Sequence, residues 1–368
     1  MAKVILKDLH KEYGKVIAVE WLDLTIYDKE FFALLGPSGC GKSSTLRMIA
    51  GLEEITEGDI FFDELRVTDL SPRDRDIAMA FENYALYPYL NVHRNIAFPL
   101  EIQKLPREEI DRKVREVAKV MGLTDILSQN VKSLSGGQQQ RTGVARALVR
   151  EPSVFLLDEP ISHLEAELRT NMRTELRRIH EDIKVTTVYV THDQAEAMTM
   201  ADRIGIMNLG KLQQVGTPQE VFVNPVNEFV AGFVGEPAMN FLDCSLETEG
   251  DRLSLVTDGK KIAFPERYLK ALAESRGRKL RLGIRPSDIE CFATDDQDGL
   301  IPGEVVFVEP RNEKVLINTD IGGTQVIAQA DSSFKPQLRT RIYLRLIDKA
   351  IHLFDPESGD NLNRVTGG

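Results

Sequence analysis

A glycine-rich run at residues 36–43 constrains the fold of this chain more than any other feature. It reads Gly-Pro-Ser-Gly-Cys-Gly-Lys-Ser, the pattern G-x-x-x-x-G-K-[ST], and it follows a continuous apolar run at residues 31–35. Leu46 and Ile49 come next at helical spacing, and Gly51 ends that pattern. A buried strand, a phosphate-binding loop and a helix in this order form the context that the motif requires. The sequence therefore predicts an α/β fold with a nucleotide site at the end of a strand.

Each residue type in this loop suits phosphate binding. Glycines let backbone N–H groups close around the β-phosphate, Lys42 supplies a positive charge between the β- and γ-phosphates, and Ser43 offers a hydroxyl group to Mg²⁺. Cys40 is interpreted as a small residue at a variable loop position rather than as a redox gate. The expected nucleotide-binding residues of the loop are Gly36, Pro37, Ser38, Gly39, Cys40, Gly41, Lys42, Ser43 and Ser44.

A second apolar run, at residues 154–157, ends in the two acids Asp158 and Glu159. Beside bound ATP, Asp158 would hold the Mg²⁺ shell with Ser43, and Glu159 would polarise the water that attacks the γ-phosphate. The alternative is an acidic strand end that caps a helix. The phosphate-binding loop upstream favours the catalytic interpretation, in which Glu159 and Lys42 carry the hydrolysis of ATP.

The run Leu-Ser-Gly-Gly-Gln at residues 134–138 predicts a second phosphate site. Ser135 is suited to cap a helix, and two glycines would expose backbone N–H groups at the positive helix end. Together with the loop, this run resembles the nucleotide-binding subunits of ABC transporters, of which it is the most specific signature. In that family, the signature of one subunit closes over ATP on another subunit. The residues expected to contact nucleotide here are Ser135, Gly136, Gly137 and Gln138.

The resemblance implies two further site residues. Tyr13, in Lys-Glu-Tyr-Gly, is similar to the aromatic residue on which adenine stacks. His192, in Thr-His-Asp, resembles the switch histidine of the family, whose imidazole bridges the γ-phosphate and Glu159. Taken alone, the tyrosine would be a strand-edge aromatic and the histidine a structural residue, so the family match carries both assignments.

Two positions depart from the family pattern. Glu82 stands where carbohydrate-importer ATPases carry a glutamine that touches Mg²⁺. Its carboxylate would also bind Mg²⁺, but it would add negative charge beside the γ-phosphate; the alternative is that it turns to solvent or pairs with a base. Residues 162–165 occupy the place of a loop that crosses the dimer interface and usually ends in aspartate, where this chain has Glu165.

Charge and composition argue against several other classes of protein. The chain carries 46 Lys and Arg against 57 Asp and Glu, a net charge of −11, which disfavours nucleic-acid binding. No apolar run approaches the roughly 20 residues that cross a bilayer, and no signal peptide is expected. Three widely spaced cysteines indicate neither a disulfide framework nor a zinc site and fit a reducing cytoplasm.

The length of 368 residues favours two domains. We expect an ABC nucleotide-binding domain at residues 1–235, with a helical subdomain at about 84–150, and a smaller β-rich domain at 236–368. Residues 282–288 and 352–356 resemble the OB-like regulatory and dimerisation domain of carbohydrate-importer ATPases; a nucleic-acid-binding barrel is the alternative. The predicted elements are helices at 107–121, 164–183 and 267–275, a strand at 185–190, and strand pairs 253–256 with 261–264, 304–308 with 314–318, and 340–346 with 351–354.

The resemblance implies the ATPase subunit of an ABC importer for a carbohydrate or polyol, with ATP and Mg²⁺ as ligands. It would lie at the cytoplasmic face of the inner or plasma membrane as a peripheral protein. Two such subunits, identical by default or paired with a different ATPase subunit, would drive separate integral membrane permease subunits, and an extracytoplasmic solute-binding protein would deliver substrate. Aromatic residues at 82–98 would either dock on the permease or pack inside the helical subdomain. The alternatives are a non-transport ABC ATPase acting on nucleic acid or ribosomes, and a degenerate ATP-binding regulator.

Overall fold

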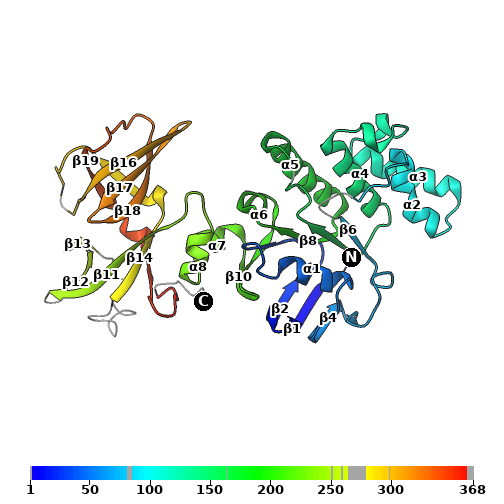
Figure 1. Ribbon diagram of the computed structural model, residues 1–368, viewed down its shortest axis with the longest axis horizontal. Coiled ribbons are helices and arrows are strands. Elements are labelled where there is room, and N and C mark those ends of the chain that lie inside the picture. Colours follow the sequence, from blue (N-terminus) through cyan, green and yellow to red (C-terminus); the bar gives the residue numbers. More distant parts are fainter. Residues whose placement is uncertain are drawn as a thin grey trace. The chain divides into compact units, whose positions relative to one another are not determined.

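The computed structural model describes residues 2–80, 85–162, 164–249, 252–257, 260–263, 279–297 and 299–362. The chain divides into two compact units, Met1–Gln219 and Glu220–Gly368 (Figure 1). Within the described residues, no helix is both long enough and apolar enough to cross a membrane.

The first unit is built on a mixed sheet whose central strands are parallel. β3 pairs in parallel with β8 and β9, β8 pairs in parallel with β7, and β6 continues the sheet beside β7. Helices alternate with these strands along the chain, which confirms the predicted α/β fold class. In spatial order the strands are β10 (Lys211–Gly216), β9 (Arg203–Asn208), β3 (Phe31–Leu35), β8 (Thr186–Thr191), β7 (Val154–Asp158) and β6 (Ile77–Ala80).

Both faces of this sheet are covered, which explains why its strands are continuous apolar runs. In β7, Phe155 and Leu157 belong to one hydrophobic core, whereas Val154 and Leu156 belong to another. The first core includes helix α5 (Ala166–Ile183), and the second includes helix α1 (Lys42–Ala50). The second core also includes residues of β1 (Val4–Tyr13), β2 (Val16–Ile26) and β4 (Glu57–Phe62), which with β5 (Leu65–Arg66) form an antiparallel sheet in the order β2-β1-β4-β5.

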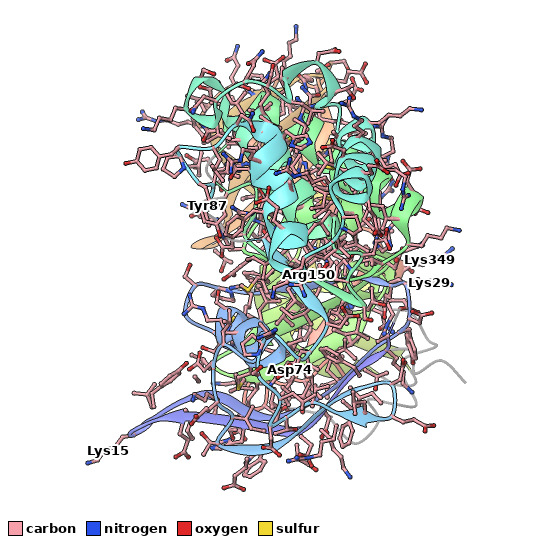
Figure 2. All side chains as sticks on the ribbon, turned by 90° about the vertical axis from the view of Figure 1, so that its right-hand side faces the viewer. Lys15, Lys29, Asp74, Tyr87, Arg150 and Lys349 are labelled. Atoms are coloured by element: carbon pink, nitrogen blue, oxygen red, sulfur yellow. The ribbon has the colours of Figure 1, made fainter. Side chains whose placement is uncertain are left out.

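The turn between β1 and β2 carries Lys15, which points away from the rest of the unit (Figure 2). Side chains alternate along β2, because Leu22, Leu24 and Ile26 are buried while Asp23 is exposed. This hairpin therefore has one face in the core and one face in solvent.

Helices α2 (Val92–Ile102), α3 (Arg107–Val120) and α4 (Gly136–Leu148) form a group at one end of the first unit (Figure 1). The helix predicted at residues 107–121 is α3, and its buried face comprises Ile110, Val114 and Ala118. This spacing of four residues is that of one helical face. Another helix of the first unit, α6 (Gln194–Met200), follows β8 along the chain.

The second unit is rich in antiparallel strands. The pairs predicted at 253–256 with 261–264 and at 304–308 with 314–318 are present as β12 with β13 and β16 with β17. One sheet comprises β13 (Lys260–Ala263), β12 (Arg252–Thr257), β11 (Asn240–Glu249), β14 (Lys279–Ile284) and β20 (His352–Phe354). The other comprises β15 (Ile289–Phe292), β19 (Arg341–Leu346), β16 (Ile301–Arg311), β17 (Lys314–Ile321) and β18 (Thr324–Asp331).

The predicted pairing of residues 340–346 with 351–354 is wrong. β19 pairs with β15 and β16, whereas β20 pairs with β14 in the other sheet. The short 3₁₀ turn Asp348–Ala350 separates the two strands and lets the chain pass from one sheet to the other. The helix expected at 267–275 lies outside the described residues.

The second compact unit begins at Glu220, earlier in the chain than the domain boundary predicted at residue 235. Helices α7 (Pro218–Val223) and α8 (Glu228–Phe233) precede the strands. The amide of Glu228 donates to the carbonyl of Gly359 at 2.8 Å, and the Arg285 guanidinium donates to the carbonyl of Val234 at 2.7 Å. These bonds attach α8 and the segment after it to the β-rich unit.

Candidate nucleotide site

The glycine-rich loop joins β3 to α1, and its backbone requires glycine. Gly41 has a φ of +102°, and a Cβ atom there would lie 2.3 Å from the carbonyl oxygen of Ala18. Gly41 is also the N-cap of α1, so no side-chain cap bonds to the N–H groups of its first turn. Lys42 is buried, and its Nζ donates to the carbonyls of Gly36 at 2.7 Å and Pro37 at 2.9 Å. The loop therefore holds a cation beside the helix end that favours anions.

Cys40 is packed inside this loop. Its side chain is buried, and burial raises the pKa of its thiol, an effect that the nearby Lys42 charge partly offsets. A thiol of raised pKa is a weak nucleophile and a poor target for oxidation. The structure thus supports the interpretation of Cys40 as a small packing residue.

The other predicted catalytic residues lie at the same edge of the sheet as the loop. β3, β8 and β7 are adjacent and parallel, so the segments after their carboxyl ends meet there. The Ser43 hydroxyl donates to Asp158 Oδ1 at 3.1 Å, which joins the loop to the end of β7. His192 Nδ1 lies 2.9 Å from Glu159 Oε2, which joins the end of β8 to the residue after β7.

Glu159 is held in an unusual backbone conformation. Its φ is +44°, in the left-handed region that non-glycine residues rarely adopt, and its amide donates to the carbonyl of Val190 at 3.0 Å. Because a carboxylate only accepts hydrogen bonds, Nδ1 of His192 is the donor of this pair. The Glu159 carboxylate thus faces His192 from a left-handed backbone position.

Ser43 and Asp158 form an oxygen pair that fits Mg²⁺. Magnesium at nucleotide sites is held by one or two protein oxygens together with phosphate oxygens, at octahedral geometry. The hydroxyl and the carboxylate lie within 3.1 Å of each other beside the phosphate loop. Glu82, the third predicted metal ligand, lies outside the described residues, as does His163 of the predicted interface loop.

Tyr13 ends β1 with its side chain exposed, and a lysine covers its ring. Lys11 Nζ lies 4.7 Å from the ring centroid and also donates to the carbonyl of Glu54 at 2.7 Å. The Tyr13 hydroxyl lies 3.5 Å from Ser44 Oγ, in the first turn of α1. These contacts connect the aromatic residue predicted to receive the base with the phosphate loop.

Comparison with known proteins agrees with this geometry. Residues 19–162 match the ABC transporter family, and residues 235–289 match the MalK OB fold domain. The trehalose/maltose import ATP-binding protein MalK of Thermococcus litoralis is 45% identical, over 98% of this chain and 99% of that protein. The sn-glycerol-3-phosphate import ATP-binding protein UgpC 2 of Agrobacterium fabrum is 43% identical, over 98% of this chain and 95% of that protein. This chain belongs to the ABC transporter ATP-binding family.

A solved structure supports the same assignment for the first unit. The dimeric post-hydrolysis state of the ATP-binding cassette MJ0796, bound to ADP and Pi, is 30% identical with a TM-score of 0.52. It covers 58% of this chain and 98% of its own. The chain is accordingly an ABC-type ATPase that binds and hydrolyses ATP, and its second unit contains the OB domain that the sequence predicted.

In this ABC ATPase the signature lies at the start of α4. Ser135 is the N-cap, its Oγ accepts from the amide of Gln138 at 3.4 Å, and Gln138 Oε1 accepts from the amide of Ser135 at 3.0 Å. Ser135 and Gly136 are exposed. Gln140, one turn later, donates to the carbonyl of Pro160 at 2.6 Å. The signature helix is thus tied to the residue that follows Glu159.

Two residues near the site were not predicted as site residues. Lys11 falls within the Lys-Glu-Tyr-Gly run, and its spacing of two residues along a strand places it on the same face as Tyr13. Arg169 lies on α5 and donates to Asp193, the residue after His192. Nothing in the sequence around Arg169 distinguishes it from the other arginines of that helix, because its partners come from distant segments.

Proposed function

We propose that this ATPase acts through the residues that meet at the carboxyl edge of the central sheet. The hydrogen bond between Glu159 and His192, beside the bond between Ser43 and Asp158, is the observation that carries this proposal. The first pair holds a general base and a polar group side by side. The second pair supplies the oxygens that suit Mg²⁺.

The proposed chemistry follows from these positions. Lys42 and the N–H groups of the loop from Gly36 to Ser44 bind the β- and γ-phosphates, and Tyr13 stacks on adenine. Mg²⁺, when bound, neutralises charge that develops on the phosphates. Glu159 orients and polarises the attacking water, while His192 contacts the γ-phosphate and fixes the Glu159 carboxylate. Glu82 is proposed as a further contact of the metal shell.

Ser135 to Gln138 begin α4, a different helix from the one that follows the phosphate loop. We propose that two copies pair so that the signature of each covers ATP on the loop of the other, with Ser135, Gly136, Gly137 and Gln138 at the γ-phosphate. The helix N-terminus supplies N–H groups and a positive dipole end. A homodimer is the proposed arrangement.

The proposed process is import of a carbohydrate or polyol. The relatives are named for trehalose and maltose and for sn-glycerol-3-phosphate, and they match nearly the whole of this chain. The chain would dock at the cytoplasmic face of the membrane on integral permease subunits, and a solute-binding protein outside would deliver the substrate.

The helical subdomain offers aromatic residues for this docking. Tyr89 is 86% exposed, whereas Tyr87 is 40% exposed and packs on Phe98, with ring centroids 4.6 Å apart. Exposed Tyr89 therefore fits the docking interpretation of this segment, whereas Tyr87 fits the packing interpretation. Tyr84 lies outside the described residues.

Purification of the tagged chain from membranes of its source organism tests the proposal. Native mass spectrometry of the detergent-extracted complex should show two copies of this chain with integral membrane subunits. After reconstitution into proteoliposomes with internal ATP, we expect uptake of a radiolabelled sugar, polyol or polyol phosphate, and no uptake with Glu159→Gln. A complex without membrane subunits, or one that contains ribosomes or nucleic acid, would contradict the proposal.

A further inference from the structure

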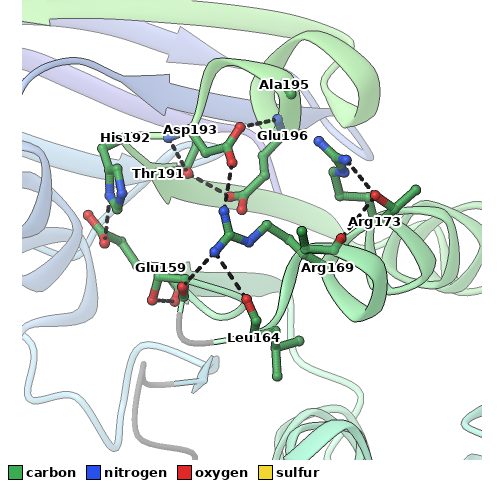
Figure 3. Close-up of polar contacts among 12 residues, drawn as sticks. Glu159, Leu164, Arg169, Arg173, Thr191, His192, Asp193, Ala195 and Glu196 are labelled. Atoms are coloured by element: carbon green, nitrogen blue, oxygen red, sulfur yellow. Dashed lines mark hydrogen bonds and ion pairs between the residues drawn. The ribbon is translucent and has the colours of Figure 1, made fainter. Parts of the chain in front are cut away.

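We propose that Arg169 is a positioning residue of the ATPase site, which holds Glu159 and His192 in one mutual orientation. This inference rests on the roles proposed above for those two residues. Arg169 lies in the first turn of α5, and its guanidinium connects two segments that are far apart in sequence (Figure 3). One segment follows Glu159, and the other follows His192.

The contacts of the guanidinium reach both segments. Nη2 donates to the carbonyls of Ser162 at 3.0 Å and Leu164 at 3.1 Å, and Nη1 donates to Asp193 Oδ2 at 3.3 Å. Three acceptors in different directions suit the planar fork of arginine, which a lysine ammonium does not reproduce. Arg169 is therefore placed to hold the loop after β7 against the loop after β8.

These contacts close a ring that passes through the catalytic pair. Ser162 Oγ donates to the carbonyl of Glu159 at 3.0 Å, and the Glu159 carboxylate accepts from His192 at 2.9 Å (Figure 3). Asp193 is the next residue after His192 and returns the ring to Arg169. Each member of the ring is thus fixed from two sides.

This ring of hydrogen bonds lies just beyond the ends of β7 and β8. Pairing between β7 and β8 ends at Asp158 and Val190, followed by the bond from the Glu159 amide to Val190. The pairing of β7 with β8 ends there, and Arg169 bridges the segments that follow the two strands. The orientation of the Glu159 carboxylate relative to the imidazole therefore depends on this bridge.

Asp193 divides its two oxygens between separate tasks. Oδ1 accepts from the amide of Glu196 at 3.1 Å and so caps α6, whereas Oδ2 accepts from Arg169. The Asp193 amide donates to Thr191 Oγ1 at 3.0 Å, and Thr191 donates to Glu196 at 2.6 Å. These last bonds order the His192 segment internally, and the Oδ2 contact joins it to α5. The bridge can consequently be removed without removing the helix cap.

The expected effect is on turnover rather than on ATP binding. The phosphate loop lies between β3 and α1, and Lys42 is held by Gly36 and Pro37, so loss of the bridge leaves the binding of phosphates intact. Misplacement of a catalytic group by about 1 Å can cost on the order of 100-fold in rate. We expect kcat to fall about 10- to 100-fold in Arg169→Gln, with KM for ATP changed by less than about twofold.

Steady-state phosphate release by the intact chain tests this expectation in three variants. Arg169→Gln removes the bridge, and Asp193→Asn removes the charged acceptor while asparagine remains a good helix cap. Arg173→Gln is the matched control, because Arg173 lies one turn further along α5 and donates to Thr170 at 3.0 Å within the same helix (Figure 3). We expect the first two variants to lose kcat and the control to behave as wild type.

A combination with His192→Ala separates positioning from general stabilisation. Because Arg169 acts through the histidine and its partner, Arg169→Gln should cost little further rate in the His192→Ala background. The inference would be overturned if Arg169→Gln lowered kcat equally in the wild-type and His192→Ala backgrounds, or if it changed KM for ATP alone. Wild-type kcat in both Arg169→Gln and Asp193→Asn would overturn it as well. If Arg169→Gln does not fold, Asp193→Asn decides alone. Absence of hydrolysis in wild type would instead refute the proposed function.

Discussion

At the scale of single residues, Lys11 shows how the structure adds to a recognised site. Its ammonium lies 4.7 Å from the centroid of the Tyr13 ring and is also anchored on the carbonyl of Glu54. A cation over one face of the ring fixes the orientation of the ring. The second face can then receive a stacked base.

We expect Lys11→Met to weaken ATP binding without slowing turnover. An exposed cation–π contact is worth about 0.5–1 kcal/mol, so loss of the preset ring orientation should raise KM for ATP by no more than about fivefold. Steady-state kinetics measure this, with Lys7→Met as the control because Lys7 is an exposed lysine on the same strand. A fall in kcat at unchanged KM would mean that Lys11 serves the chemical step instead.

At the scale of elements, the start of α5 shows the cost of the glutamate at residue 165. Glu165 is the N-cap of α5, has extended backbone angles and makes no side-chain cap hydrogen bond. Asp, Asn, Ser and Thr are favoured at this position because their short side chains reach the amide of the first turn. The departure from the family aspartate therefore has a local structural consequence.

Glu165→Asp should stabilise the chain. A new cap bond on α5 is worth about 0.5–1 kcal/mol in free energy of unfolding, measurable by chemical denaturation. Glu167→Asp is the matched control, since Glu167 is exposed and lies inside the first turn of the same helix. Equal stabilisation by both variants would indicate an effect of charge near the helix end rather than capping.

The elements differ in how far the sequence predicts them. The strands β3 and β7 and the helix α3 follow from apolar runs and helical spacing, because burial leaves a direct pattern in the sequence. The partners of β19 and β20 do not, because the turn Asp348–Ala350 moves the chain between sheets without a distinctive residue pattern. Site residues in motifs are predictable for the same reason as the strands, whereas Arg169 depends on contacts that only the fold creates.

At the scale of the whole molecule, a histidine in the second unit predicts how stability varies with pH. Burial and the charge of Arg285 lower the pKa of His352 from 6.5 to about 4. Nδ1 of His352 lies 3.3 Å from Asn361 Nδ2, which suits a neutral ring that accepts a hydrogen bond. Well above pH 6.5 this residue is neutral in both the folded and the unfolded chain.

We therefore expect the stability of the second unit to fall as the pH is lowered from 6.5 to 4. In this interval the unfolded chain binds a proton at His352 that the folded chain does not bind, so the free energy of unfolding decreases. Calorimetry of the intact chain at several pH values measures this, and His352→Gln should flatten the dependence. An equal decrease in wild type and variant would assign the effect to other groups.

The account as a whole depends on Glu159 as the residue that activates water, and Glu159→Gln tests it most directly. The amide keeps the shape of the side chain but removes the charge that polarises water, and general bases contribute on the order of 100- to 10,000-fold to rate. We expect this variant to bind ATP as wild type does, to form a stable ATP-bound dimer, and to release phosphate at least about 100-fold more slowly. Phosphate release at the wild-type rate over many turnovers would contradict the account.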